Sequence, residues 1–115
     1  MGRGEKVEEH LKEKLKDPYF KELYELEEEK LSIVKKIVEY RIRHNLTQNE
    51  LAKKSGVSQQ YISKIESGDF SNMMTLEKIL LFIGLTIKFT AVPVQKRVRK
   101  IIKRKIRSKR NLQLV

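Results

Sequence analysis

Residues 46–68 read LTQNELAKKSGVSQQYISKIESG, and this stretch carries the most specific structural signals in the chain. Thr47 and Glu50 have the spacing of a capping box, which predicts that a helix begins after Thr47. Gly56 ends that helix after about two turns, because glycine adopts a positive φ without a steric penalty. Ser58 can cap a second short helix. The stretch therefore predicts two short helices joined by a glycine turn.

The residue types in this stretch fit one short helix packed across the other. Ala52 lies where the helices would cross, and only a small side chain allows that close approach. Ser55 departs from the pattern, because its position is more often apolar. The apolar contacts that would hold the angle between the helices come from Leu51, Val57, Ile62 and Ile65. These offsets match the helix-turn-helix motif, whose second helix enters the major groove of DNA.

With these residues in place, the chain resembles the Cro/C1-type (XRE) helix-turn-helix domain over about residues 32–85. The resemblance implies an all-α, five-helix bundle that binds double-stranded DNA as a homodimer on a two-fold operator. It implies an internal salt bridge between Arg41 and Glu66. It also implies five DNA contacts: Gln48 to phosphate, Gln59 and Gln60 to base edges, and Ser63 and Lys64 to bases or phosphates.

The adjacent glutamines suit that role by their chemistry. A glutamine carboxamide has one acceptor and two donors, so it can engage N6 and N7 of an adenine together. Two neighbouring residues have alternative roles. Ser58 either only caps its helix or also contacts a phosphate, and Tyr61 either contacts DNA or packs against the scaffold.

Charge and patterning divide the chain into four segments. Residues 1–30 form an acidic helical extension with a net charge of −3, and residues 31–85 form the DNA-binding domain. Residues 86–94 alternate between apolar and polar side chains, which predicts one short strand and a candidate dimerisation element. Residues 95–115 carry 10 basic and no acidic residues and form a basic tail, in a chain with a net charge of +11.

The basic tail has helical periodicity but an unfavourable charge density. Its apolar residues recur at helical spacing: Val94, Val98, Ile101, Ile102 and Ile106. Three interpretations follow: the tail contacts DNA phosphates, it binds an acidic surface or an anionic membrane, or like-charge repulsion keeps it disordered. We favour a loosely ordered basic arm that increases the affinity for DNA.

The segments that flank the motif carry a second resemblance. LKDPYFKELYELEEEK at residues 15–30 and GLTIKFTAVPV at residues 84–94 resemble the flanks of HigA-like antitoxins of type II toxin–antitoxin modules. The resemblance implies an antitoxin that neutralises a small RNase toxin of the RelE/HigB kind and represses its own operon. The alternatives are a stand-alone XRE-family repressor and an interaction module that has lost DNA binding.

An RNase toxin that holds RNA phosphates presents a basic surface, which an acidic helix with aromatic anchors would complement. The candidate toxin-binding residues are Tyr19, Glu22, Tyr24 and Glu25. The alternative interpretation is an acidic face that only contacts solvent, with the aromatic rings packed on the protein itself.

The residue types argue against an enzyme, a cofactor and a metal. The chain has no cysteine, and its two histidines, His10 and His44, have no ligand-spaced partner. No glycine-rich phosphate loop and no apolar run long enough for a membrane span is present. We therefore expect a cytoplasmic, nucleoid-associated bacterial protein with no membrane partner.

Overall fold

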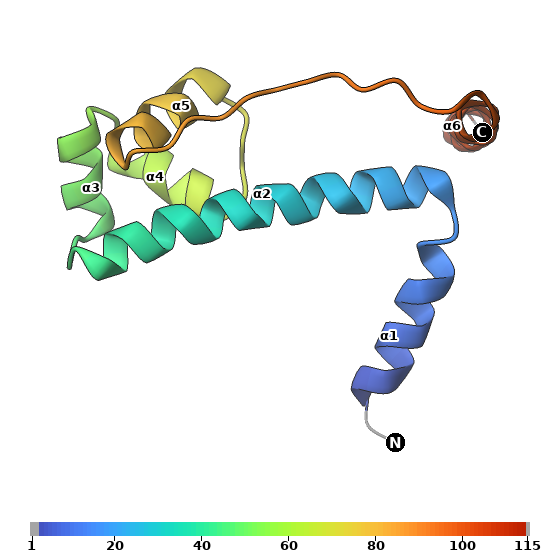
Figure 1. The fold of residues 1–115 in the computed structure, drawn as a ribbon, viewed down its shortest axis with the longest axis horizontal. Coiled ribbons are helices and arrows are strands. Elements are labelled where there is room, and N and C mark those ends of the chain that lie inside the picture. Colours follow the sequence, from blue (N-terminus) through green and yellow to red (C-terminus); the bar gives the residue numbers. More distant parts are fainter. Residues whose placement is uncertain (1–2, 115) are drawn as a thin grey trace. The chain divides into compact units, whose positions relative to one another are not determined.

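The computed structural model describes residues 3–114, and that range contains six helices and no strand. The helices are α1 (Arg3–Lys14), α2 (Pro18–Arg43), α3 (Gln48–Ser55), α4 (Gln59–Glu66), α5 (Met73–Phe82) and α6 (Lys96–Leu114). They belong to two compact units (Figure 1). The helix-turn-helix unit is Glu28–Thr90, and the terminal unit joins the residues up to Glu27 with those from Ala91 onward. Helix α2 contributes to both.

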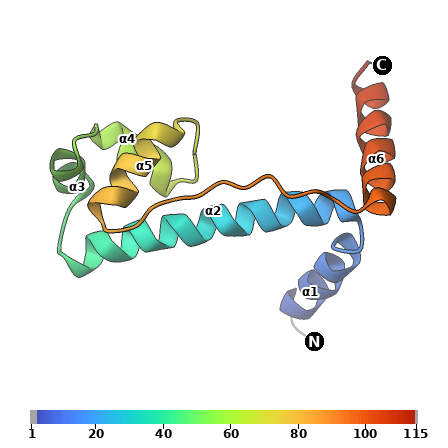
Figure 2. The same ribbon diagram turned by 45° about the horizontal axis from the view of Figure 1, so that its top comes forward.

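The hydrophobic core lies in the helix-turn-helix unit. There α3, α4 and α5 gather against the C-terminal half of α2 (Figures 1 and 2). Every buried side chain among the described residues belongs to this unit: Val34, Ile37, Leu51, Ala52, Ile62, Ile65, Leu76, Ile79 and Leu80. In α2, α4 and α5 the buried residues recur three or four positions apart, and in α3 they are the neighbours Leu51 and Ala52, so each helix turns one apolar face inward.

Local signals at the helix ends explain why the chain breaks where it does. The backbone N–H of Glu50 donates to Thr47 Oγ1 at 3.1 Å, and the N–H of Thr47 donates to Glu50 Oε1 at 3.1 Å, which completes the expected capping box. Asn72 caps α5 by accepting from the N–H of Thr75 at 3.2 Å. After α2, Asn45 takes the left-handed conformation with φ 55°, which lets the chain turn toward α3.

Helix α2 is one helix of 26 residues. Pro18 is its first residue, where the missing N–H costs nothing, and the N–H of Tyr19 donates to Asp17 Oδ1 at 3.0 Å. The expected boundary between residues 30 and 31 is therefore a change in charge and burial within a helix and not a break in the backbone.

The expected strand at residues 86–94 was wrong. This segment has no regular secondary structure, since the part of the chain that the structure describes offers it no partner strand to complete a ladder. A side chain holds its beginning instead: Glu77 accepts from Thr86 Oγ1 at 3.0 Å and from the N–H of Ile87 at 3.4 Å. The helix-turn-helix unit contains four helices, namely α3, α4, α5 and the part of α2 from Glu28 onward, where the resemblance implied five.

The basic tail, for which the sequence favoured a loosely ordered arm, is helical over residues 96–114. It forms α6, whose more apolar side lies within the terminal unit, where Val98 and Ile102 are half-buried. Lys105 Nζ lies 3.3 Å from Asp17 Oδ2. Lys109 Nζ lies 5.0 Å from the centre of the Tyr19 ring, a cation–π contact.

Candidate nucleic-acid interface

The turn between α3 and α4 sets the angle of α4. Gly56 has φ 76°, and its N–H donates to the carbonyl of Ala52, which ends α3. Ala52 is only 2% exposed, so the close approach expected at this position is present. Ser55 is accommodated at its half-buried position because its hydroxyl donates to the carbonyl of Leu51 at 2.7 Å. The polar residue that departs from the pattern therefore leaves no unsatisfied group.

Ser58 begins α4. Its side chain accepts a hydrogen bond from the N–H of Tyr61 at 3.1 Å, and its backbone is extended, with φ −78° and ψ 153°. This is the geometry of a helix cap. The hydroxyl keeps its own proton free to donate, and Ser58 is exposed, so a phosphate contact is compatible with the cap.

The two faces of α4 have different chemistry. Ile62 and Ile65 are fully buried, and they anchor the helix to the core. At about 100° per residue, four of the predicted DNA-contacting residues of α4 fall within an arc of about 140° on the opposite side, and Tyr61 lies outside this arc. All four are exposed: Gln59, Gln60, Ser63 and Lys64. The result is a polar surface on a rigid support, in which two carboxamides occupy the first helical turn.

Tyr61 contacts the scaffold. Its hydroxyl donates to the carbonyl of Asn72, the residue that caps α5. Burial raises the pKa of this hydroxyl, the negative charge of Asp69 adds to the effect, and hydrogen bonds to Thr75 and Asn72 oppose it. Of the two roles expected for Tyr61, the structure supplies the contacts for packing, since the hydroxyl already links α4 to α5.

Arg41, Glu66 and Gln48 form one hydrogen-bonded network. The guanidinium of Arg41 holds both carboxylate oxygens of Glu66, at 2.9 and 3.0 Å, and donates to the carbonyl of Leu46 at 3.2 Å. The two side chains are only 21% and 10% exposed. Gln48 Nε2 also donates to Glu66 Oε1 at 3.3 Å. The network joins the end of α2, the start of α3 and the end of α4.

This network affects how Gln48 can contact DNA. One donor of its carboxamide is used on Glu66, so the remaining N–H and the oxygen are the groups left for a phosphate or a water. The same hydrogen bond orients the side chain at the first position of α3. Sequence reasoning assigned Gln48 a contact and Arg41–Glu66 a structural role, but it did not link them.

Sequence reasoning also missed Ser67. This residue follows α4, is exposed, and continues the polar surface at the helical spacing of Ser63 and Lys64. Its hydroxyl donates to the carbonyl of Lys64 at 2.7 Å. Extending the helical periodicity of α4 by one residue beyond Glu66 would have placed Ser67 on this surface.

The four candidate toxin-binding residues lie on the first part of α2, in the terminal unit. They do not share one face, because two residues along a helix place Tyr24 about 160° from Glu22. Tyr24 instead pairs with Phe20, with ring centres 6.0 Å apart. Glu22 and Glu25 are exposed, and Tyr19 is half-buried beside Lys109.

The described residues contain no group of three or more potential metal ligands, and none of the described helices is long and apolar enough to span a membrane. His44 packs against Tyr40, with ring centres 4.2 Å apart. That contact gives this histidine a packing role.

Comparison with known proteins agrees with this geometry. Residues 37–89 match the family profile described as helix-turn-helix. Over 54 residues the chain is 48% identical to an uncharacterized HTH-type transcriptional regulator of Methanocaldococcus jannaschii, and the alignment covers 46% of this chain and 82% of that protein. No solved structure matches the chain significantly. Given this identity over most of the relative's length, the chain belongs to the XRE-type helix-turn-helix family.

Proposed function

We propose that this protein is a sequence-specific DNA-binding transcriptional regulator. The observation that carries the proposal is the pair of exposed carboxamides, Gln59 and Gln60, on the first turn of α4. The first turn of a recognition helix is the part that reaches base edges in the major groove. Its support is rigid, since the angle of α4 is set by buried isoleucines, a glycine turn and the Arg41–Glu66 pair.

In this proposal the remaining polar groups position the protein on the backbone. Gln48, Ser58 and Lys64 contact phosphates, while Ser63 contacts either bases or phosphates. Phosphate contacts raise the affinity on every sequence, and base contacts distinguish one sequence from another. The proposed function needs no metal and no cofactor, because hydrogen-bonding groups are enough to recognise bases.

Selection of bound duplexes from a random pool tests the proposal. The wild-type protein should enrich one sequence. Gln60→Ala should bind that sequence about 5- to 150-fold more weakly, corresponding to about 1–3 kcal/mol, with little change on random DNA. Gln95→Ala, at an exposed glutamine outside the helix-turn-helix unit, is the matched control. Equal losses on selected and random DNA would reject the assignment of Gln60 to base recognition.

We further propose that two copies bind a two-fold operator. One reading helix covers only a few base pairs, and a second copy adds a half-site about one helical turn away. The helix-turn-helix unit exposes large apolar side chains that a second copy could cover, including Leu81 and Ile42 at 60% and 64% exposure. Light scattering on the DNA complex should give two protein chains per duplex. One chain per duplex would reject this part of the proposal.

We propose an antitoxin role as the more specific form of this function. The support is the exposed carboxylate pair Glu22 and Glu25, whose charge complements a basic RNase of the RelE/HigB kind. Co-expression with a small RNase encoded next to this gene should yield a complex and protect the host cells. Charge reversal at both positions should weaken that complex, whereas reversal at Glu8 and Glu9 of α1 serves as the control. If neither complex nor protection is observed, the stand-alone regulator is the function that remains.

A further inference from the structure

Helix α6 carries a cationic face that the functions proposed for α4 do not use. Of its ten basic residues, Lys105 and Lys109 lie on the same side as the apolar residues and contact Asp17 and Tyr19. The other eight cover an arc of about 160° on the opposite side of the helix. They are Lys96, Arg97, Arg99, Lys100, Lys103, Arg104, Arg107 and Arg110.

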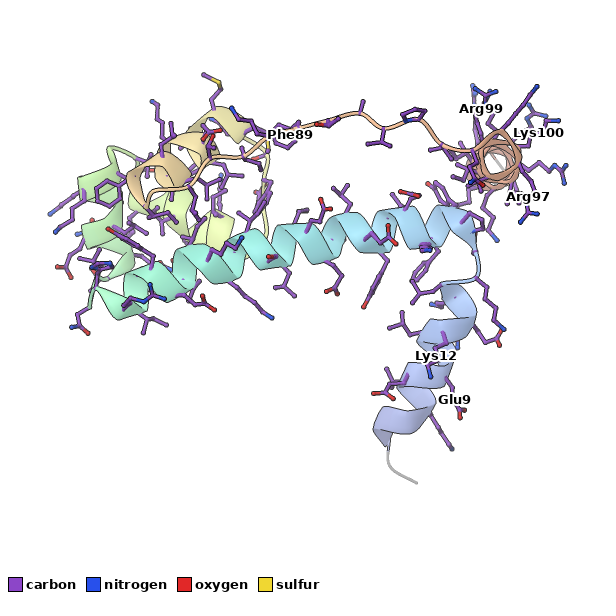
Figure 3. All side chains as sticks on the ribbon, in the orientation of Figure 1. Glu9, Lys12, Phe89, Arg97, Arg99 and Lys100 are labelled. Atoms are coloured by element: carbon purple, nitrogen blue, oxygen red, sulfur yellow. The ribbon has the colours of Figure 1, made fainter. Side chains whose placement is uncertain are left out.

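All eight of these side chains are exposed, and within the described residues none of them has an ion-pair partner. Figure 3 shows α6 end-on, with the labelled side chains of Arg97, Arg99 and Lys100 extending away from the helix axis. Eight like charges on one face repel each other, and this repulsion opposes helix formation. A polyanion on that face would remove the repulsion.

The composition of this face indicates which polyanion it fits. Five of its eight cations are arginines, whose planar guanidinium groups bind phosphates through paired hydrogen bonds. No aromatic residue follows Phe89, so α6 has no platform on which the bases of a single strand could stack. The apolar side is shared with Lys105 and Lys109, and its residues Val98 and Ile102 are already half-buried within the terminal unit, which leaves less of this side for a membrane surface. These features favour the outer backbone of a duplex.

The dimensions also fit. One row of cations runs along the helix, with successive members three or four positions apart: Lys96, Lys100, Lys103, Arg107 and Arg110. At about 1.5 Å per residue the row is about 21 Å long. Over that length a DNA duplex presents about 12 phosphate charges, at one per about 1.7 Å of its axis.

We infer that the cationic face of α6 is a second DNA-binding surface, which holds the phosphate backbone of duplex DNA without reading its sequence. The inference rests on the proposed DNA binding by α4. Residues 88–95 lie between the point where Glu77 holds the chain and the start of α6. This short connection makes binding by α6 intramolecular once α4 holds DNA.

The test is the salt dependence of binding to a labelled 30-base-pair duplex of mixed sequence. The variant K100Q/K103Q/R104Q/R107Q removes four charges from the face and keeps good helix formers. The control variant K6Q/K12Q/K35Q/K78Q removes four exposed charges elsewhere. The slope of log affinity against log salt should fall by about 3–4 in the α6 variant, and by less than about 1 in the control. Binding at 0.1 M salt should weaken at least ten-fold in the α6 variant alone. Circular dichroism checks that both variants keep their helices.

Equal slopes for the wild type and the α6 variant would overturn the inference. So would an unchanged slope together with α6-dependent binding to vesicles of phosphatidylcholine and phosphatidylserine, which would assign the face to a membrane. The outcome for α4 is separate. If the slope falls in the α6 variant but the wild type enriches no sequence, α6 binds DNA and the proposed function fails. If a sequence is enriched with no change in slope, the proposed function stands and the inference about α6 fails.

Discussion

At the residue scale, single side chains and one glycine hold the reading helix in place. Arg41 and Glu66 meet through two hydrogen bonds in a mostly buried position, where water screens the charges poorly. Gln48 shares the same carboxylate. Loss of Glu66 would therefore leave a guanidinium without its partner and release a side chain proposed to contact phosphate.

Glu66→Ala should lower the free energy of unfolding by about 2–3 kcal/mol, because a partly buried arginine loses its partner. Chemical denaturation followed by circular dichroism measures this change. Glu29→Ala, at an exposed position of α2, should change the free energy by less than about 0.5 kcal/mol. Similar values for the two variants would show that the ion pair contributes little.

Gly56→Ala should destabilise the protein by about 1–2 kcal/mol. The cause is conformational, since φ is 76° and a Cβ added there would meet no atom within 4 Å. Gly4→Ala is the matched control, because Gly4 lies in α1 and an added Cβ there also meets nothing within 4 Å. Thermal unfolding should show a loss at Gly56 and no loss at Gly4. Losses of the same size at both positions would argue against a strained turn.

At the scale of the element, α3 and α4 are too short to be stable helices by themselves, at eight residues each. Caps and packing therefore decide whether they form. The pKa of Glu50 lies below its ordinary value, chiefly because the carboxylate accepts a hydrogen bond from the backbone of Thr47. A hydrogen bond to the side chain of Thr47 and the nearby charges of Lys54 and Lys53 lower this pKa further.

The stability of α3 should consequently depend on pH. A carboxylate whose pKa is lower in the folded state stabilises that state above its unfolded pKa and loses this contribution as the pH falls through the folded value. As the pH drops through the acidic range, the unfolding free energy of the wild type should therefore decrease relative to that of Glu50→Gln. In a Thr47→Ala background this dependence should be smaller. A difference that is constant from neutral to acidic pH would contradict the cap.

At the scale of the whole molecule, the hydrophobic core and the cationic face of α6 belong to different units of the chain. Among the described residues, the buried side chains all lie between residues 28 and 90, whereas the terminal unit holds α1, α6 and the start of α2. In the described part of the terminal unit no side chain is fully buried. The helix-turn-helix unit should therefore fold by itself.

A fragment of residues 28–90 should unfold cooperatively, with a thermal midpoint within about 8 °C of that of the full chain. A fragment that begins at residue 37 is the informative comparison, since it matches the start of the family profile but lacks Val34 and Ile33, which pack on the core. It should be less stable by about 1.5–3 kcal/mol. Loss of cooperative unfolding in residues 28–90 would show that the terminal unit is needed for the fold.

Much of the helix-turn-helix unit could be predicted from the sequence because its signals are local. The capping box at Thr47, the cap at Ser58 and the positive φ at Gly56 depend on residues within one helical turn. The core residues of α4 and α5 follow from helical periodicity. The strand at residues 86–94 could not be judged in this way, because alternation records a local preference, whereas a strand also needs a partner.

Where the short helices begin and end, which of their faces are apolar, and that two glutamines open α4 can all be predicted from the sequence, because these properties depend on neighbouring residues. Three sets of contacts are known only from the folded structure: Gln48 shares the carboxylate of Glu66, Tyr61 is hydrogen-bonded to the carbonyl of Asn72, and Lys105 and Lys109 of α6 contact Asp17 and Tyr19. In each of these contacts the two partners are more than ten residues apart in the sequence. Helical periodicity and capping do not predict contacts between residues far apart in the sequence, because those contacts depend on how the helices pack.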